Sequence, residues 1–214
     1  MALFEEQTRT LTVKLVYYGP AMSGKTTNLM TLHDRLASPL KGELMMLETK
    51  DDRTLFFDLL PLGFRTPSGW LVKFKVFTVP GQVQHDSTRK SVLSRCDGVV
   101  FVADSQVSQA TNNGEAFDNL IDNLQKVGID FQKVPIVVQF NKRDLSNILT
   151  ESEVRTRWAE APWPLYFASA SNGVGVVETF AEVLTGVYRN LERESPVAEV
   201  LQLDEAGFIS AALG

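Results

Sequence analysis

Apolar and polar residues along the chain follow two periodicities, one typical of buried strands and one typical of amphipathic helices. Runs rich in apolar residues, of the kind found in central strands, occupy residues 11–18, 99–103 and 134–140. Apolar residues at helical spacing occupy residues 27–36, 112–127 and 174–194. Strands that alternate with helices predict an α/β sandwich with a mostly parallel sheet.

Three more segments complete the predicted sheet. Residues 70–79 partly alternate apolar and polar side chains, as a half-exposed strand does. They follow residues 54–62 across a turn rich in Gly, Pro and Ser, so this spacing predicts an antiparallel hairpin. Residues 164–168 supply a sixth strand. The expected architecture is therefore a mixed, mostly parallel six-stranded sheet with flanking helices.

Composition and charge narrow the class of protein. The 214 residues are 44% hydrophobic and 22% charged, which is ordinary for a soluble globular protein. The net charge of −5 argues against a nucleic-acid binder, because phosphate contacts need clustered Lys and Arg. The single cysteine, Cys96, excludes an intramolecular disulfide and suits a reducing cytoplasm. No signal peptide, long apolar span or lipidation motif is present, so we expect no intrinsic membrane anchor.

We expect the chain to have two parts, a globular domain over residues 1–194 and a C-terminal tail over residues 195–214. Pro196 is expected to end the preceding helix. The tail has three acidic residues and no basic ones. Its apolar residues are enough to dock on the domain or on a partner, and a disordered tail is the alternative.

A phosphate-binding motif lies between the first predicted strand and the first predicted helix. Residues 19–26 read G-x-x-x-x-G-K-T, and a strand before and a helix after it are the context in which this motif cradles phosphates. The backbone N–H groups of such a loop point at one anion. We expect Lys25 to reach the β- and γ-phosphates and the Thr26 hydroxyl to bind Mg²⁺. The alternative is a chance glycine turn. The predicted nucleotide-binding residues here are Gly19, Pro20, Ala21, Met22, Ser23, Gly24, Lys25, Thr26 and Thr27.

A second motif, Thr-Val-Pro-Gly-Gln at residues 78–82, follows the end of a predicted strand. Gly81 can offer its backbone N–H to the γ-phosphate, because no side chain obstructs the approach. Gln82 can orient an attacking water through its amide. Alone, this segment is an ordinary Pro-Gly turn, but beside the phosphate loop it predicts a sensor of the γ-phosphate.

A third motif, Asn141-Lys142-Arg-Asp144, predicts the base. Guanine shows two adjacent donors that the Asp144 carboxylate accepts together, whereas adenine has an acceptor at N1. The Lys142 stem can lie over the base, and backbone N–H groups at Ser169 and Ala170 can bind the base oxygen. The alternative is a solvated loop of mixed charge. Together, the three motifs indicate a guanine nucleotide, GTP or GDP.

Five segments read GPAMSGKTTNL, DDRTLFFDLLP, TVPGQ, FVADS and NKRDL. Together they resemble bacterial Ras-like small GTPases of the gliding-motility and cell-polarity type, and the similarity covers residues 9–193. The resemblance implies a P-loop NTPase with a Ras-like sandwich fold that switches between GTP- and GDP-bound shapes. It implies a roadblock-type GTPase-activating dimer and downstream effectors as partners. It also fits a cytoplasmic protein that partners recruit to a cell pole.

The resemblance also assigns the first switch. Thr54 is expected to bind Mg²⁺ together with Thr26, and Arg53 to neutralise charge on the transferring phosphoryl group beside Gln82. By composition alone, residues 51–54 form a charged surface loop, at the end of a loop predicted over residues 43–53.

Thr78 occupies the place of the aspartate in the Ras-like Asp-x-x-Gly motif, as it does in this family. The usual carboxylate behind the Mg²⁺ ligands is therefore missing, and Asp58 is a candidate substitute because it lies on the neighbouring strand. His85 and Arg89, in the second switch, are expected to be surface or partner contacts. Trp158 and Trp163 are expected to pack.

Two functional classes follow from these motifs. The favoured one is a GTP-hydrolysing switch, slow alone and stimulated by a partner. The alternative is a nucleotide-dependent scaffold with negligible hydrolysis unless a partner is present. A P-loop kinase is a distant third, because no arginine-rich lid for an acceptor is evident in the sequence.

Overall fold

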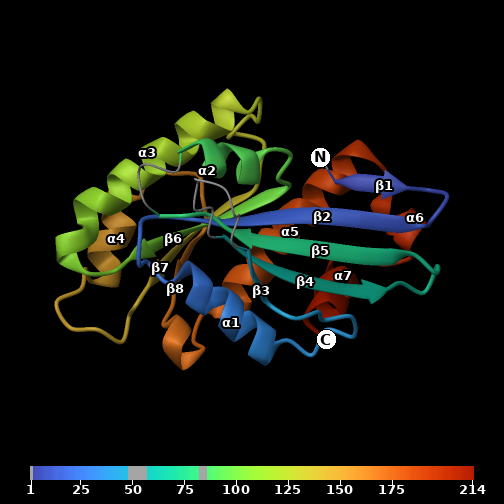
Figure 1. Cartoon of the computed structure of the whole chain (residues 1–214), viewed down its shortest axis with the longest axis horizontal. Coiled ribbons are helices and arrows are strands. Elements are labelled where there is room, and N and C mark those ends of the chain that lie inside the picture. Colours follow the sequence, from blue (N-terminus) through green and yellow to red (C-terminus); the bar gives the residue numbers. More distant parts are fainter. Residues whose placement is uncertain (1, 48–56, 82–85) are drawn as a thin grey trace.

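A mixed β-sheet runs through the protein, which we describe from a computed structural model over residues 2–47, 57–81 and 86–214. The strand order is β3-β4-β5-β2-β6-β7-β8, with β1 paired to β2 outside this path (Figure 1). The strands are β1 (Leu3–Glu5), β2 (Thr10–Tyr18), β3 (Met45–Leu47), β4 (Phe57–Arg65), β5 (Leu71–Thr78), β6 (Gly98–Asp104), β7 (Ile136–Asn141) and β8 (Leu165–Phe167).

The pairing of the strands confirms the predicted sheet and adds two short strands to it. The central strands β5, β2, β6, β7 and β8 are parallel neighbours, and β4 is antiparallel to β5, as the predicted hairpin requires. The additions are β1, antiparallel to β2, and β3, antiparallel to β4. Each has three residues, too few to show a periodicity, and β3 lies within the segment predicted as a loop.

Helices cover both faces of the sheet. They are α1 (Lys25–Arg35), α2 (Asp86–Leu93), α3 (Ala110–Lys126), α4 (Glu151–Arg157), α5 (Val176–Glu194), α6 (Val197–Leu201) and α7 (Glu205–Leu213). The predicted helices correspond to α1, α3 and α5, whereas α2 and α4 were not predicted because each is short. No helix among the described residues is both long and apolar enough to cross a membrane.

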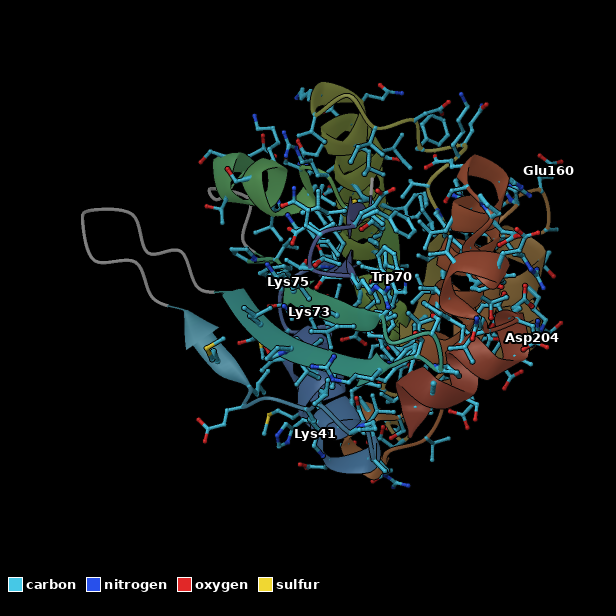
Figure 2. All side chains as sticks on the ribbon, turned by 90° about the vertical axis from the view of Figure 1, so that its right-hand side faces the viewer. Lys41, Trp70, Lys73, Lys75, Glu160 and Asp204 are labelled. Carbon is cyan, nitrogen blue, oxygen red and sulfur yellow. The ribbon has the colours of Figure 1, made fainter. Side chains whose placement is uncertain are left out.

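Two hydrophobic cores lie on opposite faces of the sheet. One is formed by the sheet with α1, α5, α6 and α7, and the other by the sheet with α2, α3 and α4. Trp158 and Trp163 pack against the second core, as predicted. On β5, exposed Lys73 and Lys75 alternate with buried Phe74, which confirms a half-exposed strand (Figure 2).

The residues of the predicted tail lie in the first core. Four apolar side chains of α6 and α7 are fully buried, namely Val197, Leu201, Phe208 and Ala212. The Phe208 ring makes edge contacts with Phe64 of β4 and Phe74 of β5. The backbone N–H of Ala37, just beyond α1, donates to Leu213 O at 3.1 Å. Residues of α6 and α7 therefore pack in the same core as the sheet, and the division of the chain at residue 194 stays a prediction.

Candidate functional site

Loops that follow the parallel strands meet at the carboxyl edge of the sheet, which is where open α/β folds bind ligands. The side chain of Asn141, the last residue of β7, joins two of these loops. Its Nδ2 donates to Ser23 O in the phosphate loop at 2.9 Å, and its Oδ1 accepts from the backbone N–H of Ala170 at 2.9 Å. Both groups are buried, so this one residue fixes the phosphate loop against the loop after β8.

Two glycines let the phosphate loop fold as it does. Gly19 has φ of +141° and Gly24 has φ of +98°, values that side chains rarely allow. A Cβ on Gly19 would lie 2.2 Å from Val102 O, and one on Gly24 would lie 2.3 Å from Asn141 Nδ2. Gly24 is also the residue before α1, so an anion held by the phosphate loop would lie at the N-terminus of that helix.

Lys25 lies inside this loop and is only 7% exposed. Its ammonium group donates to Gly19 O at 2.9 Å and to Pro20 O at 2.6 Å. Burial lowers the pKa of Lys25 to about 7; the nearby Asp58 carboxylate opposes that shift and the Arg89 guanidinium adds to it. The site therefore holds a cation whose charge is only weakly stabilised, and a bound phosphate would stabilise it.

Asp58, on the strand beside β5, faces the start of α1. Its Oδ2 accepts from Thr26 Oγ1 at 2.6 Å and from Thr78 Oγ1 at 3.0 Å, while its backbone N–H donates to Thr78 Oγ1 at 2.8 Å. A carboxylate thus stands behind the Thr26 hydroxyl although position 78 has none. Asp58 thus offers, from β4, the carboxylate that an aspartate at position 78 would otherwise offer.

The glycine of the second motif packs directly on the phosphate loop. A Cβ on Gly81 would lie 2.3 Å from Ala21 Cα, so no other residue fits this approach. The predicted site residues Arg53, Thr54 and Gln82 lie outside the described residues, as does His85.

The residues predicted to recognise the base also lie together. Ser169 Oγ donates to Asp144 Oδ1 at 2.5 Å, and this bond is the main reason that the pKa of Asp144 is lowered. Lys142 has φ of +66°, and its Nζ forms an ion pair with Asp104 Oδ2 at 2.7 Å. Asp144 is therefore held ionised, and only the ionised carboxylate can accept hydrogen bonds from two donor groups of guanine together.

Sequence reasoning missed several residues that support these loops. Asp104, at the end of β6, holds the Lys142 ammonium. Gln139 Nε2 donates to Asn28 Oδ1 at 3.0 Å, and Asn28 Nδ2 donates to Gly24 O at 2.9 Å, which ties β7 to the phosphate loop. The signal for Gln139 was present, since it is a polar residue inside an otherwise apolar strand.

Of the two alternatives predicted for Arg89, the surface contact is wrong and the partner contact stays a prediction. Its side chain is 7% exposed and lines a cavity of about 490 Å³ together with Gly19, Pro20, Ala21 and Gly81. Arg89 lies on the inner face of a short amphipathic helix that the sequence did not predict, so the side chain points toward the protein rather than toward solvent.

Comparison with known proteins agrees with this geometry. Residues 66–187 match the ADP-ribosylation factor family, Arf. The chain is 44% identical to the mutual gliding-motility protein MglA of Myxococcus xanthus, over 90% of this chain and 99% of that protein. It is 23% identical to ADP-ribosylation factor-like protein 6 of Caenorhabditis elegans, over 84% of this chain and 89% of that protein.

These similarities favour a hydrolysing switch over a scaffold with negligible hydrolysis. The guanine and phosphate motifs, joined through Asn141, occupy one edge of a mostly parallel sheet. The chain therefore belongs to the Arf-related, MglA-like family of Ras-like small GTPases: it binds GTP and GDP and hydrolyses GTP.

Proposed function

We propose that this GTPase is a switch for cell polarity or gliding motility, whose GTP- and GDP-bound shapes bind different partners. The observation that carries the proposal is the 44% identity, along 99% of its length, to a protein named for gliding motility. In this proposal a roadblock-type dimer activates hydrolysis, effectors bind the GTP-bound shape, and partners recruit the cytoplasmic protein to a cell pole.

We assign the phosphates to residues 19–27 and Gly81. Lys25 binds the β- and γ-phosphates, and Gly81 offers its N–H to the γ-phosphate. We assign the base to Asp144, whose carboxylate accepts hydrogen bonds from the two adjacent donor groups of guanine. The other residues assigned to the base pocket are Asn141, Lys142, Ser169 and Ala170. The bond between Ser169 Oγ and Asp144 supports this assignment because it orients the carboxylate.

We assign Mg²⁺ to the hydroxyls of Thr26 and Thr54, with Asp58 behind them. Among the described residues there is no group of three or more His, Cys, Asp and Glu side chains that could hold a metal alone. That fits Mg²⁺ bound with a nucleotide, because this ion takes few protein ligands and fills its shell with phosphate oxygens and waters. The bond from Thr26 to Asp58 points the hydroxyl lone pairs away from the carboxylate and toward such an ion. Bound Mg²⁺ neutralises charge on the phosphates.

For hydrolysis we assign Gln82 to orient the attacking water and Arg53 to neutralise charge on the transferring phosphoryl group. Arg53 adjoins Thr54, so a threonine that binds Mg²⁺ would bring the guanidinium close to the γ-phosphate. The activating partner then acts by ordering both residues and supplies no arginine of its own.

Single-turnover GTP hydrolysis, alone and with a roadblock-type partner, tests this mechanism. Arg53→Ala and Gln82→Leu should each keep GTP affinity but lose most of the stimulated rate, since an arginine in this role contributes roughly 10³–10⁵-fold. Arg65→Ala, which removes an exposed arginine at the far end of β4, serves as the matched control. If Arg53→Ala is still stimulated to the wild-type rate, the arginine comes from elsewhere.

A further inference from the structure

A chain of three buried polar side chains joins helices α1 and α5 through strand β7. Gln139 of β7, Asn28 of α1 and Thr179 of α5 are each 0% exposed. The side-chain nitrogen of Gln139, Nε2, donates to Asn28 Oδ1 and to Thr179 Oγ1, both at 3.0 Å. We refer to these three residues as the Gln139 relay.

Each helix of the relay carries the connection back to the glycine that precedes it. In α1, Asn28 Nδ2 donates to Gly24 O at 2.9 Å. In α5, Thr179 Oγ1 donates to Gly175 O at 2.5 Å. Gly24 and Gly175 are the N-cap residues of these helices, and both have φ in the left-handed region, 98° and 73°. Gln139 therefore fixes the start of α1 relative to the start of α5.

The relay adds a second connection to the one that Asn141 makes at the edge of the sheet. Gln139 and Asn141 lie two residues apart on β7, so their side chains are on the same face of the sheet. Asn141 joins the phosphate loop to Ala170, and the relay joins the two helices that begin after these loops. Two connections at different depths restrain a rotation of the two loops that one connection alone would allow.

Stability of the core does not account for the polar side chains of the relay. Among the described residues no group donates to Gln139 Oε1, so this buried acceptor is unpaired. An unpaired buried acceptor costs free energy, and replacement of hydrogen-bonded partners by apolar groups of the same shape can be neutral or stabilising. The polar side chains instead provide direction, because their hydrogen bonds hold two glycine carbonyls in fixed places, as the supporting residues of a binding site do.

We propose that Gln139 is a positioning residue for the nucleotide: through the relay it sets the distance between the start of α1 and the loop before α5. This inference rests on the proposed assignment of residues 19–27 to the phosphates and of Ser169 and Ala170 to the base. A nucleotide makes both sets of contacts at once only where the two loops are at the right separation. Loops that are held there before binding cost less free energy to order when the nucleotide binds.

The test compares a ligand that spans both loops with one that occupies the phosphate loop alone. Titration calorimetry measures binding of GDP and of inorganic pyrophosphate to the full chain with Mg²⁺. Thr179→Val cuts the relay at α5 and leaves the bond from Asn28 to Gly24 in place. It should weaken GDP binding by about 3- to 10-fold, the effect of one neutral hydrogen bond, and change pyrophosphate binding by less than about 2-fold.

Two control variants separate positioning from the general effect of a lost hydroxyl. Thr179→Ser keeps the hydroxyl and should bind GDP as wild type does. Thr185→Val removes a hydroxyl of the same helix that donates within α5, to Ala181 O at 3.0 Å, and should leave both affinities unchanged. A loss of GDP affinity in Thr185→Val equal to that in Thr179→Val would contradict the inference.

Equal weakening of GDP and pyrophosphate by Thr179→Val would overturn the inference, and so would unchanged affinity for both. Should Thr179→Val fail to fold, Gln139→Met gives a second measurement, because it cuts the relay at β7 and keeps the backbone bond from Asn28 N to Gly24 O at 2.9 Å. It should weaken GDP binding more than pyrophosphate binding, and a wild-type ratio of the two affinities counts against the inference. Wild-type protein that binds ADP as tightly as GDP would instead overturn the proposed base pocket itself.

Discussion

At the scale of single residues, the candidate site contains a buried charge that the surrounding protein groups compensate only weakly. Lys25 is buried with two carbonyl oxygens as its partners, and carbonyl dipoles compensate an ammonium less well than an anion does. The Thr26 hydroxyl is aimed by Asp58. Both features have consequences that solution experiments can measure.

Nucleotide binding should take up protons through Lys25. Its pKa of about 7 in the free protein means that most of the lysine is neutral above that pH. Phosphates favour the charged form, so the pKa rises on binding and the complex gains about one proton at around pH 8. Affinity for GDP should therefore fall as the pH rises above about 7.

Titration calorimetry in two buffers of different ionisation enthalpy measures this proton uptake. Lys25→Arg is the control, because arginine stays charged in the free protein and should show no uptake. If wild type and Lys25→Arg take up the same number of protons per nucleotide bound, Lys25 is already charged before the nucleotide binds.

Asp58 and Thr78 should exchange roles in a double variant. Asp58→Asn removes the charge behind Thr26 and should weaken Mg²⁺ binding by about 10- to 100-fold, as loss of such a supporting carboxylate does. Thr78→Asp alone places two carboxylates at one site and should be destabilising. The combination Asp58→Asn with Thr78→Asp should recover Mg²⁺ affinity, because the charge then comes from β5.

The rate of nucleotide release as a function of Mg²⁺ concentration reports this affinity. Asp58→Asn with wild-type Mg²⁺ dependence would refute the role of Asp58.

At the scale of elements, α7 behaves as part of the domain. Its apolar side chains share a core with α5, β4 and β5, and its N-cap Asp204 accepts from Gly207 N at 2.7 Å. Tyr188 Oη of α5 donates to Leu203 O at 2.9 Å, and Arg189 forms a two-bond ion pair with Glu205. These contacts fix the helix on the face opposite α3, away from the phosphate loop.

Phe208→Ala should lower the free energy of unfolding by about 3–5 kcal/mol, as truncation of a buried aromatic ring does. GTP affinity of the folded protein should stay unchanged, because Phe208 lies in the core away from the nucleotide site. Ser210→Ala, at an exposed position of the same helix, is the control and should change stability by less than about 0.5 kcal/mol. Denaturant unfolding measures both, and wild-type stability of Phe208→Ala would mean that the tail does not contribute to the core.

At the scale of the whole molecule, the site joins loops that are far apart in the sequence. Asn141 connects the loop at 19–24 with the loop at 169–170, and Asp58 connects β4 with α1. The parallel order of β5, β2, β6, β7 and β8 makes these contacts possible, because it places the carboxyl ends of the strands at one edge.

The sequence alone determined the features that depend on local pattern. The five longer strands, the short strand β8, the three longer helices and the three nucleotide motifs were predicted, because periodicity and motif spacing involve residues that are close in the chain. The short strands β1 and β3 and the short helices α2 and α4 were not predicted, since too few residues carry their pattern.

Tertiary structure decided which side chains meet across elements. Only the pairing of β4 with β5 brings the Asp58 carboxylate to Thr78 and Thr26. Only the packing of α2 turns Arg89 toward the phosphate loop, and only the packing of α7 buries Phe208. A side chain's partner depends on which surfaces lie side by side, and that is a property of the packed molecule rather than of any stretch of sequence.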